Sequence, residues 1–580
     1  MTGYSRIAVL LPFAFASLPI VNASEHDADA PKTIVELQQF RQTSSIPIES
    51  RGGRKGVATL VNLNPAINAW YLLKIAWNDG GSELLFHLEN PEPRTRRLLL
   101  DEKYPTGIAI AEGKNRHFCD LFEGDALGQA RASQHIFAPL CDGRLYLRNA
   151  ATGHRTNLEV TTEFLREHVW GGEKIIGLGH ILLGDMHRET GKVEAESATA
   201  GVKALDSSDL PLPARIDATY ADRVLTSGNL GIDLEGPERT GMTPGAWYAA
   251  SGNPGVYVSI LQPNLIDSAI LQSYKTRVNS LDSIEASALC YLIAFDLDRV
   301  ELGYALGTEH PKVGWSDHML PQMRDPKLPG PDGIASIAPL ISTVLVGPGN
   351  APKTVATFTG GFKREHGAFK YGNLALQNHS THYGFIENGV VFSTLQPGLA
   401  TILVFDDGSV EMKTWAEADN RLLSRVRHAR QNGVPVIEFD EALHSPTPGA
   451  LVNRWGPGNW SGSEEVKLRT MRSGAALQTN HGKRFLIYAV FSDATPSAMA
   501  RIFQAYRCDY AMLLDMNALE HTYLAVYRRS GPQIFVDHLL KGMSELDKST
   551  EGEVVPRFLG YADNRDFFYV VRRSPREGQP

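Results

Sequence analysis

The chain has 580 residues, of which 43% are hydrophobic and 21% charged, and its formal net charge is −8. This composition excludes a disordered protein, and the length allows about two to four domains with sizeable cores. Because basic residues alternate with acidic ones and form no basic stripe, we expect no nucleic acid partner.

The first 23 residues have the order of a cleavable signal peptide. Arg6 precedes an apolar run from Ile7 to Val21, and small residues follow as far as Ala23. The run is shorter than the roughly 18 to 20 apolar residues that a spanning helix needs. We therefore expect a secreted or periplasmic protein without an integral membrane span after cleavage, the alternative being an uncleaved anchor.

Short apolar runs separated by turn sequences indicate a mostly β N-terminal domain over residues 46–189, of unknown role. Asn78-Asp79-Gly80-Gly81 is one such turn. Residues 190–213 are rich in small, polar and acidic side chains, which predicts a linker. A middle β-rich region follows over residues 214–284.

The four cysteines are an even number in a chain that we expect to be exported, where thiols tend to oxidise. Cys119 and Cys141 are close in sequence and flank strand-like segments, which makes a local disulfide plausible. Cys290 and Cys508 would form either a long-range bridge or two buried free thiols.

Hairpins and helices alternate between residues 285 and 572. Asn388-Gly389 and Asp406-Asp407-Gly408 each lie between two strand-like runs and predict β-hairpins. The spacing of apolar residues predicts a helix over 417–430.

A βαβ unit is predicted next. A buried strand at 485–491 leads to a helix with Thr495 as N-cap and Pro496 as its first residue, and a second strand follows at 510–514. We therefore expect an α+β fold, with a mixed sheet in the C-terminal domain and a mostly β region before it.

Asp515 directly follows the second of these strands. Ligands of open α/β sheets usually bind beyond the carboxyl ends of the strands. A carboxylate there suits general acid–base chemistry or binding of a hydroxyl. The alternative is that Asp515 caps the next turn.

Two further motifs suit an anion. The backbone N–H groups of Gly360 and Gly361, after Thr359, have no bulky side chains to keep an anion away. The guanidinium of Arg472 matches a phosphate or a carboxylate. The alternatives are a glycine pair that serves only its turn and an arginine that is solvated at the surface.

Five histidines of this half are candidate metal ligands or proton carriers: His366, His379, His382, His481 and His521. A metal site needs three or four ligands to converge, which the sequence does not show. We expect no metal and no cofactor. The sequence also has no P-loop, GxSxG or HExxH motif.

In this order and spacing, the C-terminal segments resemble the phosphodiester glycosidase family, over residues 285–572. The matching segments are Thr359-Gly360-Gly361-Phe362, the hairpin at Asn388-Gly389, Arg472-Ser473-Gly474-Ala475-Ala476, and Thr495-Pro496 with the helix that leads to Leu514-Asp515. The family usually has asparagine where this chain has Thr359, and a glycine run where it has Met516-Asn517-Ala518.

The resemblance implies an exported hydrolase that cleaves a sugar 1-phosphodiester in envelope or extracellular glycans. It implies that Asp515 and Arg472 are catalytic, with Arg472 on the phosphate and Asp515 transferring a proton or holding a sugar hydroxyl. Thr359 and Asn517 would orient the glycan or sugar-phosphate substrate, and the Gly360-Gly361 backbone would contact its phosphate.

The departures from the family pattern at Thr359 and Met516 favour a second hypothesis. In it the chain is a non-catalytic protein that retains the fold and binds a glycan or another envelope component.

Overall fold

The computed structural model describes residues 38–573, except residues 51, 158, 162–191, 196–208, 236–240, 312–337, 339, 363–382, 455–467 and 532. The predicted signal peptide lies outside the described residues. Strand makes up 44% and helix 14% of the structure. The protein is therefore mostly β, and the predicted α+β fold class is wrong.

Tertiary pairing explains this error. The segment predicted as a helix over 417–430 forms a 3₁₀ helix, η8 (Glu417–Arg425), followed by a strand, β21 (Val426–Gln431). β21 lies between β17 (Phe385–Glu387) and β19 (Ala400–Phe405), so its backbone groups bond to neighbouring strands on both sides. The longest α-helix described, α6 (Pro496–Ala505), has only 10 residues.

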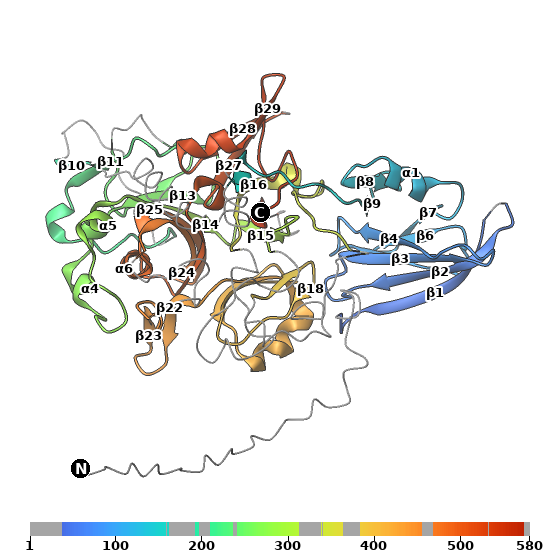
Figure 1. The fold of residues 1–580 in the computed structure, drawn as a ribbon, viewed down its shortest axis with the longest axis horizontal. Coiled ribbons are helices and arrows are strands. Elements are labelled where there is room, and N and C mark those ends of the chain that lie inside the picture. Colours follow the sequence, from blue (N-terminus) through green and yellow to red (C-terminus); the bar gives the residue numbers. More distant parts are fainter. Residues whose placement is uncertain are drawn as a thin grey trace, which may run out of the picture.

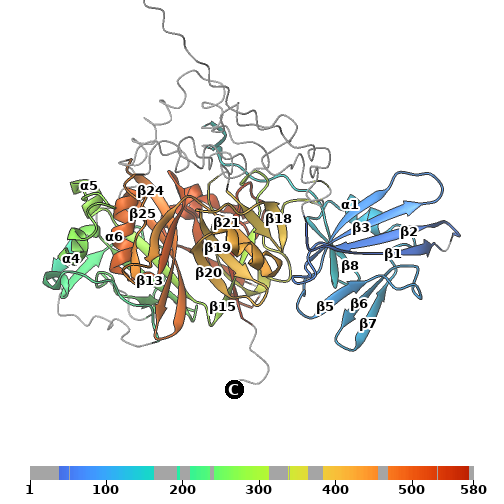
Figure 2. The same cartoon turned by 90° about the horizontal axis from the view of Figure 1, so that it is seen from below.

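The N-terminal region is an antiparallel sheet with its own apolar core, shown in blue in Figure 1. In spatial order its strands are β1 (Gln42–Glu49), β2 (Lys55–Asn62), β3 (Trp70–Trp77), β4 (Leu84–Glu89), β9 (Leu145–Arg148) and β8 (Phe137–Leu140). A smaller sheet of β5 (Arg96–Leu99), β6 (Ile108–Glu112) and β7 (Asn115–Cys119) lies beside it, as does α1 (Ala126–Ala132) (Figure 2).

A disulfide joins Cys119 and Cys141 in this region, which confirms the local bridge considered from the sequence. Cys290 and Cys508 are buried free thiols. The bridge ties the end of β7 to the turn between β8 and β9, so it links the smaller sheet to the larger one.

Two larger sheets pack face to face in the rest of the chain. The first contains β12 (Tyr248–Ala249), β13 (Val256–Leu261), β14 (Cys290–Asp296), β25 (Lys483–Ala494), β24 (Thr470–Asn480), β26 (Tyr510–Met516), β22 (Pro435–Asp440) and β23 (Ser445–Pro448), in that spatial order. The second contains β15 (Val300–Ala305), β31 (Phe567–Arg572), β16 (Thr354–Thr359), β27 (Leu524–Ser530) and β28 (Gln533–His538). The rings of Phe358 in β16 and Tyr488 in β25 are tilted against one another with centroids 4.7 Å apart, so aromatic rings fill the space between the sheets.

A third sheet adjoins these two. It consists of β18 (Val390–Ser393), β17, β21, β19 and β20 (Val410–Thr414). The hairpins predicted around Asn388-Gly389 and Asp406-Asp407-Gly408 are confirmed as β17–β18 and β19–β20.

The predicted βαβ unit is confirmed as β25, α6 and β26. Thr495 caps α6 by accepting a hydrogen bond from the Ala498 N–H, and Pro496 is the first helical residue. β24 lies between β25 and β26 and is antiparallel to both, so the two strands of the unit run parallel with one strand between them.

The remaining elements are short. The predicted linker contains β10 (Lys192–Ala195), which pairs with β11 (Arg223–Thr226). The others are α4 (Ser268–Gln272), α5 (Ser283–Ser287), β29 (Lys548–Thr550), β30 (Glu553–Val555) and the 3₁₀ helices η2 (Ala218–Tyr220), η3 (Pro263–Leu265), η5 (Ala351–Lys353), η9 (Leu519–His521) and η10 (Lys541–Leu546).

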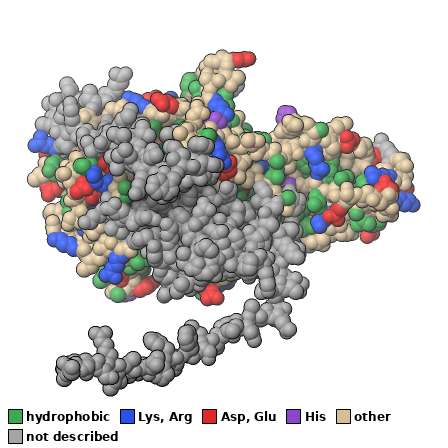
Figure 3. Space-filling model, in the orientation of Figure 1, with side chains coloured by type: hydrophobic (Ala, Val, Ile, Leu, Met, Phe, Trp, Pro, Cys, Tyr) green, Lys and Arg blue, Asp and Glu red, His purple; other side chains and the backbone are tan. Residues whose placement is uncertain are grey.

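Surface charge is mixed rather than segregated. On the described part of the face in Figure 3, basic and acidic side chains lie among one another. Among the helices in the described ranges, none is long and apolar enough to cross a membrane.

Candidate active site

The three large sheets meet at the carboxyl end of β26, where Asp515 lies. The side chain of Asn432, just after β21, donates hydrogen bonds to the carbonyl oxygens of Leu513 and Leu514 at 2.8 and 2.6 Å. It also accepts one from the Phe362 N–H at 3.1 Å. One amide side chain thus joins the third sheet to the ends of β26 and β16.

Asp515 is buried but not sealed, with 6% of its surface exposed. Its Oδ1 accepts a hydrogen bond from the Met516 N–H at 2.8 Å, and its Oδ2 accepts one from Arg565 Nη1 at 3.1 Å. Burial raises the pKa of Asp515 to about 7, against the lowering effect of the Arg565 guanidinium. This carboxyl group therefore changes protonation near neutral pH, as a general acid or base must.

Arg565 joins Asp515 to a second carboxylate. Its Nη2 donates to Oε1 of Glu159 at 2.8 Å, and Asn564 donates to the same oxygen at 2.9 Å. Burial opposes ionisation of Glu159, but Arg565 and His310 outweigh it and hold the pKa of Glu159 well below its usual range. Glu159 stays ionised while Asp515 titrates, so the two carboxyl groups differ in protonation state.

His521, in η9, lies beside Asp515. Its Nδ1 is 2.5 Å from the carbonyl oxygen of Met516 and 4.0 Å from Asp515 Oδ1. Because a carbonyl oxygen only accepts, Nδ1 carries the hydrogen and Nε2 is left with its lone pair. Burial and Arg565 lower the pKa of His521 well below its usual value, so the ring is neutral, and 22% of the side chain is exposed.

The turn at Gly360-Gly361, called the glycine turn below, holds the side chain of Asp566. The Gly360 N–H donates to the carbonyl oxygen of Asp566 at 2.9 Å, and a Cβ at Gly360 would lie 2.2 Å from Asp566 Oδ2. The Gly361 N–H also bonds to Asp566. Arg430 and Tyr304 donate to Asp566 Oδ2 at 2.8 and 2.9 Å. The space that Gly360 leaves is therefore occupied by a carboxylate, and a Cβ at Gly361 would instead meet Asn432 Oδ1 and Arg430.

Arg472 lies on the other face of the sheet from Asp515. It pairs across β24 and β26 with Met516, and its Nη1 is 3.1 Å from Met516 Sδ. Successive side chains of a strand point to opposite faces, so Asp515 points away from Arg472. Arg472 also donates to the carbonyl oxygens of Ala494 and Leu468, and burial lowers its pKa to about 9.

Thr359 and Asn517 support the backbone around the site. Thr359 Oγ1 donates to the carbonyl oxygen of His521 at 2.7 Å. Asn517 has φ of +84°, a conformation that asparagine tolerates better than most residues, and its side chain accepts a hydrogen bond from Thr470. The structure thus brings together the backbone near Thr359 and Asn517 with Asp515, and it separates Arg472 from them.

Of the five histidines considered from the sequence, His521 lies in the site and His481 lies in the turn between β24 and β25. His366, His379 and His382 lie outside the described residues. Within the described ranges, no three His, Cys, Asp or Glu side chains are grouped as a metal site.

Sequence reasoning missed Arg565, Glu159 and Asp566. The run Asp563-Asn564-Arg565-Asp566 was the available signal, because four polar residues directly precede the buried strand β31. Glu159 gave no signal, since it is distant in sequence from every other residue of the site.

The fold and the site together define a mostly β protein with a buried acid–base cluster where three sheets meet. No protein-family model matches the chain, and no curated protein matches its sequence.

Two solved structures show a distant likeness. One is the catalytic domain of zebrafish N-acetylglucosamine-1-phosphodiester alpha-N-acetylglucosaminidase, auto-inhibited by its pro-peptide. It is 10% identical, over 63% of this chain and 96% of that one, with a TM-score of 0.27. The other is a Burkholderia pseudomallei protein named as exported, 10% identical over 59% of this chain and 86% of that one, with a TM-score of 0.18. At such scores neither a shared family nor a shared activity is shown.

Proposed function

We propose that the chain is an exported acid–base hydrolase that cleaves a sugar 1-phosphodiester, with Asp515 as its proton-transferring group. The observation that carries the proposal is the buried position of Asp515 at the end of β26, with Arg565 bonded to its carboxyl group. Burial also raises its pKa to about 7. Glycoside and phosphodiester cleavage both need a group that can give a proton to a leaving oxygen.

Each polar group of the cluster has a role in this reaction. Asp515 donates a proton to the leaving oxygen, or takes one from the attacking water. His521 offers the Nε2 lone pair as a second acceptor. Arg565 places positive charge beside Asp515, where the charge of a phosphodiester would be stabilised.

The sequence-based roles change accordingly. Arg472 bonds to backbone carbonyls on the other face of the sheet, so we assign the charge-stabilising role to Arg565. Gly360 and Gly361 act indirectly in this proposal, by holding Asp566 and through it Arg430. Thr359 and Asn517 position the backbone on either side of Asp515.

One observation favours the second hypothesis, a glycan-binding protein without catalysis. The glycine turn is already filled by Asp566, so among the described residues it has no free space for a substrate phosphate. Turnover separates the two hypotheses.

The test is hydrolysis of a panel of sugar 1-phosphodiesters by the purified mature protein, with release of reducing sugar and of phosphomonoester both measured. We expect Asp515→Asn to lower kcat by about 10² to 10⁴-fold, the usual contribution of a general acid or base. The wild-type rate should change with an apparent pKa near 7, and this inflection should be lost in the variant.

Asp296→Asn is the matched control. Asp296 is also a buried aspartate whose pKa is raised by burial, but it pairs with Phe485 at the opposite end of β25. Equal losses in both variants would indicate a folding defect. No turnover by the wild type, with glycan binding intact in all three proteins, would support the binding protein instead.

A further inference from the structure

The three-stranded sheet of β5, β6 and β7 has one face in the N-terminal core and one face outside it. Leu98, Ile108, Ile110 and Cys119 belong to that core. Successive side chains of a strand point to opposite faces, so the residues that alternate with these four point outward. Figure 2 shows the three strands splayed away from β1 and β2 at the edge of the molecule.

Strand register places two exposed apolar side chains in one row of the outward face. Leu99, Ala109 and Phe118 pair with one another across the three strands. Phe118 is 54% exposed and Leu99 is 39% exposed. The ring of Tyr104, in the loop between β5 and β6, is tilted against the ring of Phe118 with centroids 4.6 Å apart. These side chains form an exposed apolar patch, called the aromatic face below.

Polar groups border the aromatic face. Arg116, two residues before Phe118 on the same side of β7, forms an ion pair with Asp101 at 3.1 Å. The side chain of Arg116 is 55% exposed, so it can make further hydrogen bonds. The hydroxyl of Tyr104 donates a hydrogen bond to Asp120. The border of the aromatic face therefore has both donors and acceptors, and charges of both signs.

The size of the aromatic face limits what can cover it. A phenylalanine side chain has roughly 150 to 250 Å² of surface, so the exposed parts of Phe118 and Leu99 amount to on the order of 200 Å². A standard protein–protein interface buries about 800 Å² on each partner. The face is thus too small for a stable contact with a second copy of the chain, and one or two sugar rings would cover it. Its mixed charges do not suit an anionic membrane surface.

We infer that the aromatic face binds a glycan chain, with a pyranose ring stacked on Phe118 and its hydroxyl groups bonded to the polar border. The C–H groups on one side of a pyranose are apolar and weakly positive, and the face of an aromatic ring is weakly negative. Sugar hydroxyls both donate and accept hydrogen bonds, so they match the guanidinium group of Arg116 and the carboxylate of Asp101. The inference gives the N-terminal region a function of its own.

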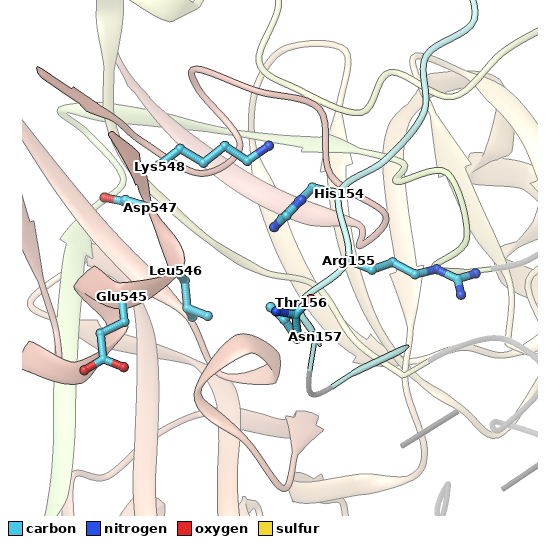
Figure 4. Close-up of a pocket in the computed structure, with 8 residues that line it drawn as sticks. All are labelled: His154, Arg155, Thr156, Asn157, Glu545, Leu546, Asp547 and Lys548. Atoms are coloured by element: carbon cyan, nitrogen blue, oxygen red, sulfur yellow. The ribbon is translucent and has the colours of Figure 1, made fainter. Parts of the chain in front are cut away.

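The N-terminal region is also bonded to the body, so a glycan on it would keep a fixed orientation relative to the active site. The chain that leaves this region passes through residues 154–157, which line a cavity opposite residues 545–548 (Figure 4). The His154 N–H donates to the carbonyl oxygen of Ala562 at 3.0 Å, and the Asn564 N–H donates to that of His154 at 3.3 Å. Delivery of a substrate in this way rests on the proposed function, whereas binding of the glycan does not.

The test is calorimetric titration of the purified mature protein with three neutral hexasaccharides: cellohexaose, chitohexaose and maltohexaose. We expect saturable binding of at least one of them. Phe118→Ser should weaken it by about tenfold or more, because the stacked ring is lost. Phe118→Leu keeps an apolar side chain without a ring and should weaken it as well, whereas Phe118→Trp should retain it. Phe439→Ser is the matched control, since Phe439 is a phenylalanine of β22 that is 51% exposed.

No saturable binding of any hexasaccharide would overturn the inference, as would equal affinities of Phe118→Ser and the wild type. Self-association in sedimentation, or binding to phosphatidylglycerol vesicles, that Phe118→Ser abolishes would identify another occupant of the face and would also overturn it. The hexasaccharides contain no phosphodiester, so failure of the proposed hydrolase activity leaves these outcomes unchanged.

Discussion

At the scale of single residues, the site depends on two buried carboxyl groups that bond to the same guanidinium group. Arg565 bonds to Glu159 at 2.8 Å and to Asp515 at 3.1 Å. Glu159 remains ionised, whereas burial raises the pKa of Asp515 to about 7. Two carboxyl groups with separated pKa values are the usual arrangement when one of them has to exchange a proton.

The raised pKa of Asp515 makes a stability prediction. Its ordinary value is 3.8, so the folded protein holds this proton more tightly than the unfolded chain does. The resulting stabilisation is fully present below about pH 4 and is lost as the pH rises through about 7, a change of about 4 kcal/mol. Asp515→Asn does not titrate and should lack this change.

Urea unfolding of the wild type and of Asp515→Asn at about pH 4 and about pH 8 checks this pH-dependent loss of stability. Other titrating groups contribute equally to both proteins, so the difference in unfolding free energy isolates Asp515. The variant should gain stability relative to the wild type at the higher pH. A difference that does not vary with pH would mean that Asp515 has an ordinary pKa.

At the scale of elements, the turn after β16 is a potential anion-binding motif that a carboxyl group of the protein itself already occupies. Gly360 and Gly361 leave room for an anion and present their N–H groups, as their sequence suggested. Asp566, just before β31, fills the room at Gly360, and Arg430 of β21 compensates its charge at 2.8 Å. Three strands from two sheets are thereby fixed around one internal carboxylate.

The disulfide allows a prediction about the N-terminal sheets. Cys119 and Cys141 are separated by 22 residues, and closing a loop of this length stabilises a fold by about 3 kcal/mol. The Cys119→Ser/Cys141→Ser variant should lose that much in denaturant unfolding. Dithiothreitol should lower the midpoint of the wild type and leave that of the variant unchanged, and equal midpoints without reductant would contradict the prediction.

At the scale of the whole molecule, the N-terminal region contributes directly to the site. Its sheet packs on the body, with the rings of Trp70 and Phe392 6.0 Å apart and Arg148 donating to the carbonyl oxygen of Thr343 at 2.9 Å. The chain then continues past β9 to Glu159, which reaches Arg565. The site is therefore complete only when both parts of the molecule are in place.

Glu159→Gln tests this coupling. Without the negative charge of Glu159, the guanidinium group of Arg565 has Asp515 as its only carboxylate partner among the described residues, so the ionised form of Asp515 becomes more favourable. The apparent pKa near 7 in the pH–rate profile should shift to lower pH. Glu309→Gln is the control, because Glu309 pairs with Arg155 of the same segment and not with Arg565. Unchanged profiles in both variants would contradict the coupling.

Local chemistry made some of this structure predictable. Asn388-Gly389 and Asp406-Asp407-Gly408 have the backbone freedom that hairpin turns need, and Thr495 with Pro496 satisfies the first turn of a helix, so these elements follow from adjacent residues. The position of Asp515 at the end of a buried strand was also predictable, because Asp515 directly follows the apolar run at 510–514. The proximity of Cys119 and Cys141 in sequence favoured their pairing.

Tertiary structure decided the rest. Residues 417–430 have helical periodicity, yet part of them becomes a strand because β17 and β19 offer backbone partners on both sides. Arg472 and Asp515 belong to neighbouring strands, and only the register of β24 with β26 sends them to opposite faces. Glu159 and Arg565 are 406 residues apart, and no local sequence pattern indicates that they bond in the folded protein. The sequence by itself thus determined turns, caps and strand ends, whereas burial and register, which set side-chain direction and pKa, determined the active site.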